Sequence, residues 1–176
     1  MTQRIGPCRY LAASKPRKER EEVEFYRCTK CGRLLTGWPS QGGQPHCCGQ
    51  EMKRLIPGGP AEQDILDYEI LGGPNENAVR VTWEKRPEWL YLETFRGGQL
   101  IFPDPRDRKA VFALAGKDAY AYCDKDPCVE CSFRCKHGFI LYAFWAEEGL
   151  AALPLNRIST ASTRGGYTTK TPSQSQ

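Results

Sequence analysis

Short stretches in which hydrophobic and polar residues alternate dominate the middle of the chain. In the segment 78–83, Val79, Val81 and Trp83 fall on one side and polar residues on the other, which is the period-two pattern of a half-buried strand. Further strands are predicted at 24–27, 89–95, 99–102, 109–114, 119–122 and 139–145, with a glycine-rich turn at 96–98 that forms a hairpin. No long amphipathic helix is predicted. The pattern indicates a mostly β protein with a sandwich over residues 64–146.

Composition divides the rest of the chain into smaller parts. Residues 1–23 are predicted to be a flexible arm, either a solvated leader or a segment that docks on a partner. Residues 24–56 form a compact cysteine-rich unit, and residues 57–62 (PGGPAE) have the composition of a linker. Residues 158–176 are rich in Ser, Thr and Gly, lack acidic residues, and are predicted to be disordered. We therefore expect two small domains, both mostly β, between two flexible ends.

Charge and hydrophobicity exclude several classes of function. The formal net charge of the 176 residues is +4, with 25 basic against 21 acidic residues, which argues against a dedicated nucleic-acid-binding protein. The longest apolar run, residues 138–146, is too short to span a bilayer. The N-terminus has no apolar segment of the kind that marks a secretory signal. We therefore expect a cytoplasmic protein that binds neither nucleic acid nor membrane.

Nine cysteines and two histidines carry the candidate chemistry. In a protein without an export signal, this many cysteines indicates metal ligation rather than disulfides. Cys28 and Cys31 form a C-x-x-C pair, and fifteen residues later Cys47 and Cys48 stand side by side. Four thiolates can close a tetrahedron around one metal ion, and this ligand set leaves both zinc and iron open.

Two glycines follow these cysteine pairs. Gly32 comes directly after the C-x-x-C pair, where a positive φ would turn backbone amides toward sulfur. Neighbouring side chains normally diverge, so the adjacent cysteines can bind one metal only from a bent backbone. Gly49 is predicted to supply that bend. His46, just before the pair, is interpreted as a surface loop residue.

The segments Tyr26-x-Cys28-x-x-Cys31-Gly32 and Cys47-Cys48-Gly49-x-x-Met52 resemble desulforedoxin and the N-terminal domain of desulfoferrodoxin. The resemblance covers about 30 residues. It implies a rubredoxin-like centre in which the four cysteines hold one redox-active iron that carries one electron. It also implies that the chain can form a homodimer.

Weaker similarity to the second part of desulfoferrodoxin, an immunoglobulin-like superoxide reductase domain, follows in the same order. The similar segments are Glu88-Trp89-Leu90, residues 119–123 (AYAYC) and His137-Gly138. In that family the iron has four histidines and one cysteine as ligands, and His137 with Cys123 or Cys135 matches its last two. The other three histidines have no counterpart here. The resemblance therefore implies an immunoglobulin-like sandwich, whereas the loss of ligands argues against a functional superoxide reductase.

A second cysteine group lies between these last two segments. Cys123, Cys128, Cys131 and Cys135 have the spacing C-x4-C-x2-C-x3-C, with His137 close behind. Part of this spacing occurs in iron–sulfur proteins, but zinc and cluster sites usually draw some ligands from farther away. An iron–sulfur cluster, a mononuclear zinc or iron, and free or disulfide-bonded cysteines all remain open.

These features favour an iron-binding electron-transfer protein in which the second cysteine group is a candidate relay. We expect a redox protein as its partner. The alternative is a structural zinc protein that docks as a subunit on a larger redox complex, and a divergent superoxide reductase using Cys123 and His137 is a third reading. The many aromatic residues at strand positions are expected to fill the core.

Overall fold

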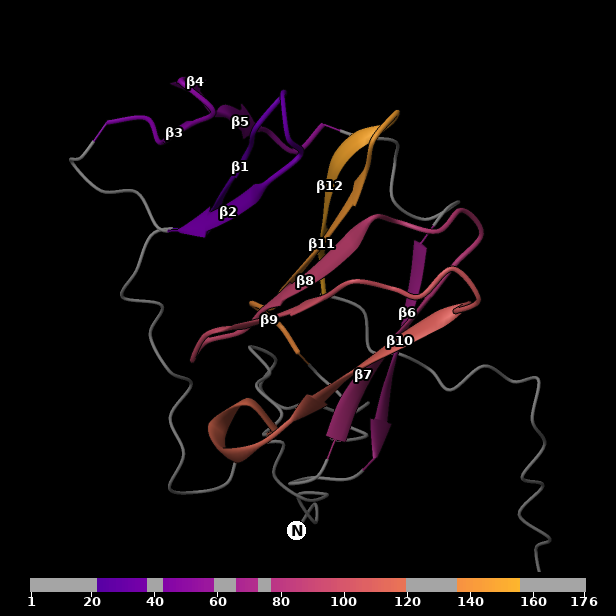
Figure 1. Ribbon diagram of the computed structural model, residues 1–176. Helices are drawn as coiled ribbons and strands as arrows, with labels where there is room; N and C mark the ends of the chain where they lie inside the picture. The colour runs from indigo at the N-terminus through magenta and orange to yellow at the C-terminus, as the bar shows by residue number, and fades with distance from the viewer. Residues whose placement is uncertain (1–21, 38–42, 59–65, 73–76, 120–135, 156–176) are drawn as a thin grey trace, which may run out of the picture.

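The computed structural model describes residues 22–37, 43–58, 66–72, 77–119 and 136–155 (Figure 1). The strands are β1 (Glu24–Arg27), β2 (Leu34–Gly37), β3 (His46–Cys47), β4 (Gln50–Glu51), β5 (Lys53–Leu55), β6 (Leu66–Gly72), β7 (Asn77–Trp83), β8 (Trp89–Glu93), β9 (Gly98–Ile101), β10 (Lys109–Leu114), β11 (Ile140–Trp145) and β12 (Gly149–Pro154). A 3-10 turn, η1 (Gly116–Ala119), follows β10. No helix in these ranges has the length and hydrophobicity needed to cross a membrane.

The larger part of the structure is a sandwich of two antiparallel sheets. One sheet has the strand order β10-β7-β6 and the other β12-β11-β8-β9. Their facing side chains form a core whose completely buried members include Ile70, Val79, Val81, Leu90, Leu92, Phe112, Phe139 and Leu141. In β7 the predicted alternation is confirmed, since Val79, Val81 and Trp83 are buried and Thr82 is exposed. The mostly β fold and the sandwich are therefore both confirmed.

The predicted hairpin joins β8 and β9. Thr94 N donates to Gly97 O at 2.9 Å and closes the turn. Beyond it, Gly98 lies opposite Glu93 in the register, beside the side chain of Tyr91. A Cβ at Gly98 would overlap the hydroxyl and the ring of Tyr91, whereas a Cβ at Gly97 would meet nothing within 4 Å. The second glycine is therefore required by packing and the first is not.

We expect Gly98→Ala to lower the free energy of unfolding by about 1–3 kcal/mol, because the buried ring of Tyr91 must move to make room. Gly97→Ala is the matched control and should change stability by no more than about 0.5 kcal/mol. Urea denaturation of the two variants measures the difference. Equal free energies of unfolding would show that the Tyr91 ring can move aside without loss of stability.

The smaller part contains the sheet β2-β1-β5 and the two-stranded hairpin β3-β4. It lies against the outer face of the four-stranded sheet (Figure 1). Val23 and Phe25 form one buried cluster with side chains of the sandwich: Trp89, Tyr91, Tyr142, Phe144 and Leu150. The ring centroid of Phe25 lies 5.0 Å from that of Trp89 and 5.0 Å from that of Tyr142. The small unit thus shares its apolar core with the sandwich.

Polar contacts reinforce this packing at the end of β1. Arg27 forms an ion pair with Glu88, with Nη2 and Oε2 3.0 Å apart, and its guanidinium carbon lies 4.8 Å from the ring centroid of Phe144. After β5, Pro57 forms a β-bridge with Leu150, and Gly58 N donates to Leu150 O at 3.0 Å. The segment with linker composition therefore begins with residues that pair with the sandwich.

Several elements differ from the sequence-based expectation. The strand predicted at 119–122 is wrong at Ala119, which ends the 3-10 turn η1, and residues 120–122 lie outside the described residues. The sheet also continues past residue 146, because β12 pairs with β11 along its whole length. Short strands β2 and β5 were not predicted. They flank β1 and complete the small sheet.

A buried polar cluster lies at the end of the sandwich where η1 ends. The side chain of Lys136 is completely buried, and its Nζ donates to Asp118 O and to Ala119 O, both at 2.9 Å. The same ammonium lies 5.7 Å from the ring centroid of Phe139. The side-chain amide of Asn77 also donates to Ala119 O. These bonds hold residues 118–119 and residue 136 together.

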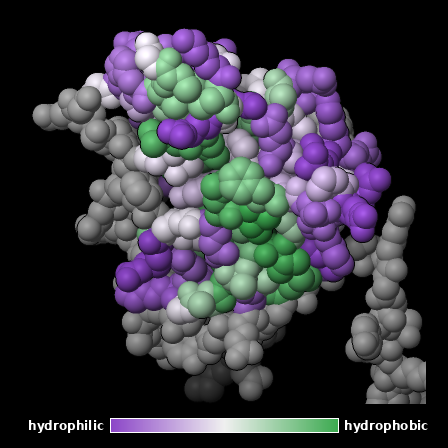
Figure 2. Space-filling model, viewed as in Figure 1, coloured by the Kyte–Doolittle hydropathy of each residue, from purple (hydrophilic) through white to green (hydrophobic). Residues whose placement is uncertain are grey.

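Hydrophobic residues are also exposed beside the edge strands. Figure 2 shows hydrophobic surface in the middle of the face on which β9 and β10 run in Figure 1. Leu100 in β9, Phe102 just after it and Val111 in β10 are 39%, 64% and 48% exposed. Phe102 is therefore an aromatic side chain that lies mostly in solvent, in contrast to the buried aromatic residues of the core.

Candidate metal centre

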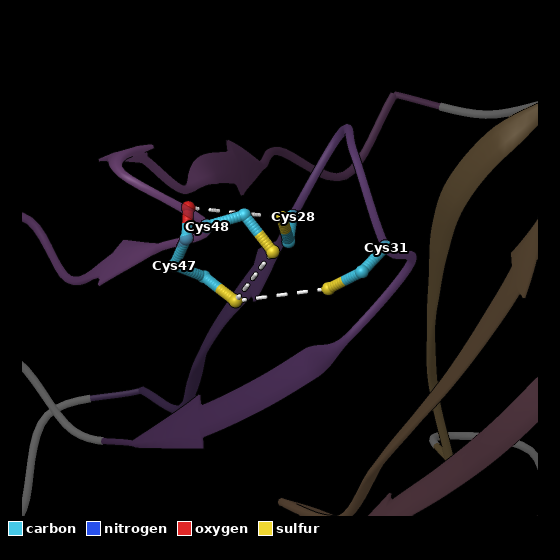
Figure 3. A group of neighbouring side chains, drawn as sticks. All are labelled: Cys28, Cys31, Cys47 and Cys48. Atoms are coloured by element: carbon cyan, nitrogen blue, oxygen red, sulfur yellow. Dashed lines mark hydrogen bonds between the residues drawn. The ribbon is translucent and has the colours of Figure 1, made fainter.

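The first cysteine pair lies in a tight turn that follows β1. Gly32 N donates to Cys28 O and Cys28 N donates to Arg33 O, each at 2.9 Å, so the loop folds back before β2 begins. Gly32 has a φ of +72°, as the sequence predicts for the residue after the pair. The turn places the side chains of Cys28 and Cys31 on one side of the loop (Figure 3).

The adjacent pair lies in the β3–β4 hairpin. Cys47 pairs with Gln50, and the two residues between them, Cys48 and Gly49, have φ values of +52° and +75°. Positive φ at both central residues is the signature of a type I′ hairpin turn. The bend expected at Gly49 therefore begins one residue earlier, with Cys48 itself in a left-handed conformation. This backbone twist lets the consecutive side chains of Cys47 and Cys48 bring their sulfur atoms to the same site.

We expect Gly49→Ala to weaken metal binding by roughly 5- to 30-fold, because a left-handed residue other than glycine costs about 1–2 kcal/mol in the geometry that the ligands require. Gly37→Ala, at the end of β2, is the control, because a Cβ there would meet nothing within 4 Å. Competition with a chelator measures both affinities. An unchanged affinity in Gly49→Ala would mean that the turn does not set the ligand geometry.

The four sulfur atoms lie as one group (Figure 3). All are within 4.8 Å of one another, with Cys31 Sγ 3.7 Å from Cys47 Sγ and Cys47 Sγ 3.8 Å from Cys48 Sγ. A tetrahedral ion with metal–sulfur distances of about 2.3 Å separates its sulfurs by about 3.8 Å. A disulfide would need about 2.05 Å. The donor set and its spacing thus fit a metal centre with four cysteine ligands, and within the described ranges no other group of three or more Cys, His, Asp or Glu residues does.

Two side-chain contacts join the loops that carry the sulfurs. Lys30 Nζ donates to Cys48 O at 3.3 Å, and the side-chain amide of Gln50 donates to the hydroxyl of Thr29. No motif in the sequence marks these residues as part of the site, although their positions between and close after the cysteines are a usable signal. Such outer contacts keep metal ligands oriented. His46 is exposed, as expected, but it lies in strand β3 and not in a loop. Its Nδ1 bonds to Gln44 O at 3.1 Å.

The metal-free thiols differ in acidity. The backbone N–H of Cys31, aided by that of Lys30, donates to Cys28 Sγ and lowers the pKa of this thiol to about 6, against the opposing effect of burial. The neighbouring sulfurs, that of Cys31 first, raise the pKa of Cys48 to about 12. Interaction with Cys31, together with burial, also raises the pKa of Cys47. At neutral pH, Cys28 is therefore mostly a thiolate, and Cys47 and Cys48 are thiols.

We expect metal affinity to rise steeply with pH. Metal ligation requires thiolates, so binding near pH 7 must release at least the protons of Cys47 and Cys48. Two released protons correspond to about a 100-fold gain in apparent affinity per pH unit, and below pH 6 protonation of Cys28 adds a third. Chelator competition with Zn(II) between pH 6 and 8 measures the slope. A slope of one or less would contradict the pKa order given above.

Exposure divides the site into two sides. Cys28 is buried at 1% exposure and Cys47 is half-buried, whereas Cys31 and Cys48 are exposed. One side of the sulfur group is thus buried against the protein, and the side formed by Cys31 and Cys48 faces solvent. A metal ion there would be covered in part and accessible to another molecule through the sulfurs of Cys31 and Cys48.

The second cysteine group is not placed by the structure. Cys123, Cys128, Cys131 and Cys135 lie outside the described residues, between Ala119 and Lys136. His137 is half-buried in the turn that precedes β11. Since Arg27 packs on Phe144 near the other end of β11, His137 and the first site lie at opposite ends of that strand. The two regions are therefore not brought together along the four-stranded sheet.

Comparison with known proteins supports the fold. The structure is similar to the crystal structure of the superoxide reductase from Treponema pallidum, with a TM-score of 0.53 and 16% sequence identity, over 75% of this chain and 98% of that chain. No family model matches the sequence. The search of curated proteins also gives no match. The chain thus has the fold of a superoxide reductase, joined to a four-cysteine site that is compatible with metal binding.

Proposed function

We propose that the protein is a one-electron carrier whose centre is iron held by Cys28, Cys31, Cys47 and Cys48. The observation that carries the proposal is the sulfur group itself, with four thiols at tetrahedral spacing, two of them exposed. Iron bound by four thiolates supplies a one-electron couple. The β3–β4 hairpin and the C-x-x-C turn hold the thiolates in place, and the exposed side gives a redox partner access.

A structural zinc site is the second candidate. Metal at this position would close the end of a sheet whose core is shared with the sandwich, so it would stabilise the attachment of the small unit even without redox chemistry. In that case the protein is a zinc-binding subunit that docks on a larger redox complex. A superoxide reductase with a remodelled centre has less support, because the chain has only two histidines.

Metal analysis of anaerobically purified protein distinguishes these functions. We expect one iron per chain at the first site, without acid-labile sulfide, and a high-spin ferric EPR signal that disappears on one-electron reduction. A variant with serine at positions 123, 128, 131 and 135 isolates that site from any second centre. Zinc alone, together with failure of iron-reconstituted protein to cycle between two oxidation states, would reject electron transfer in favour of the structural role.

A further inference from the structure

The charges around the exposed sulfurs are distributed unevenly. Arg27 ends β1, Arg33 precedes β2 and Lys53 begins β5, so each strand of the small sheet has a basic residue at the end nearest the cysteines. Lys30 adds a fourth positive charge within the C-x-x-C loop. At the opposite end of β1, Glu24 forms an ion pair with Arg54. The basic end of this sheet therefore coincides with the sulfur group.

Not all of these charges are available to a partner. Arg27 is engaged by Glu88, whereas Lys30, Arg33 and Lys53 are exposed and form no ion pair with another described residue. The acidic residues of the nearby sandwich loop, Glu147 and Glu148, are both paired with Lys85. On the small unit, the exposed carboxylate of Glu51 offsets one of the three exposed positive charges. The side chains around the sulfur ligands, not counting the ligands themselves, thus carry a net positive charge.

We propose that the rim formed by Lys30, Arg33 and Lys53 around the exposed sulfurs of Cys31 and Cys48 is the docking face for an acidic electron-carrier protein. The proposal rests on the electron-transfer function given above and names the kind of partner. Complementary charge accelerates encounter and orients the partner, so that its redox group is brought to the sulfur edge. In the exchange the reduced carrier loses one electron and the ferric site gains it, with no atom or proton transferred.

The test uses an acidic plant-type [2Fe–2S] ferredoxin as the probe and the full-length chain. The double variant Arg33→Glu/Lys53→Glu reverses two charges that lie outside the metal ligands, and Lys109→Glu on β10 is the control with the same kind of change far along the sandwich. Binding to the zinc-loaded protein is measured by NMR titration at several salt concentrations. We expect the double variant to bind at least about tenfold more weakly and the control within about twofold of the parent.

Electron transfer is measured on the iron-loaded protein by stopped flow. The rate of reduction by ferredoxin should fall with salt and fall further in the double variant. Reduction by the methyl viologen radical, a small cation, should change in the opposite direction. Unchanged iron content and an unchanged visible spectrum in the double variant show that the site itself is intact.

The outcomes separate the two proposals. Equal ferredoxin affinity in the double variant and in the Lys109→Glu control, or no binding at all, would overturn the docking face even if the iron is redox-active. Tighter binding of a short DNA duplex than of ferredoxin would assign the basic rim to nucleic acid and also overturn it. Charge-dependent binding of ferredoxin without electron transfer would leave the docking face standing and reject the electron-carrier function.

Discussion

Replacing Phe25 with alanine is expected to destabilise the protein by about 3–5 kcal/mol and to weaken metal binding at the same time. Phe25 is 1% exposed and its ring packs against three aromatic side chains of the sandwich, those of Trp89, Tyr91 and Tyr142. Truncation would leave a cavity where β1 contributes its one fully buried side chain to the cluster shared with the sandwich. Since Cys28 lies three residues further along the same strand and turn, a loosened β1 also loosens a ligand.

Urea unfolding of the metal-loaded protein measures the first effect, and chelator competition measures the second. A loss of about 3 kcal/mol in the attachment of the small unit corresponds to roughly a 100-fold weaker metal affinity if the two processes are fully coupled. Phe102→Ala is the matched control, because that side chain is 64% exposed and its removal should cost no more than about 0.5 kcal/mol. Lower stability with unchanged metal affinity in Phe25→Ala would show that the site folds independently of the sandwich.

Replacing Cys28 with serine is expected to abolish stable metal binding at the first site. Cys28 is the one buried member of the sulfur group, and it is the thiol whose pKa is lowered by backbone donors, so it is the ligand most prepared to bind. A hydroxyl cannot supply a thiolate, and the three remaining sulfurs leave the tetrahedron open. We expect the metal content to fall from one ion per chain to less than about a tenth of that value after dialysis against a chelator.

Elemental analysis and the visible spectrum of the iron form provide the measurement for this variant. Cys8→Ser is the control, because Cys8 lies 20 residues before Cys28 in the sequence and belongs to neither cysteine group. Full occupancy in Cys28→Ser would mean that the metal is held elsewhere, with the second cysteine group as the first alternative. If Cys28→Ser also kept full metal occupancy in the variant that lacks the second cysteine group, the four-cysteine site would not be the metal centre.

The sequence predicts those parts of the molecule whose signals are local. The alternation in β7, the glycine turn between β8 and β9, and the positive φ at Gly32 are all confirmed. The spacing of the four cysteines was enough to bring them to one candidate site, and the structure places their sulfurs together. Each of these features depends on residues close in sequence or on a ligand pattern with few alternatives.

Features that depend on distant packing were not predicted. All five residues of β8 are buried, and the last of them is the charged Glu93. The apolar run of the first four residues indicates a strand covered on both faces, but it does not say what covers the second face. The covering element is β1, which lies far earlier in the chain. β12 was missed because its sequence, GLAALP, has no β-branched or aromatic residue to mark a strand. The left-handed Cys48 is equally unmarked, since cysteine rarely adopts that conformation.

The buried ammonium of Lys136 has a thermodynamic consequence for the cysteines that precede it. By bonding to the carbonyls of Asp118 and Ala119, it holds together residues 119 and 136, which flank the 120–135 segment in the sequence. Closing a loop of about 15 residues costs on the order of 3 kcal/mol in chain entropy. If the four cysteines of this segment bind one metal ion, the folded sandwich therefore lowers the entropy cost of that binding relative to a free peptide of the same sequence.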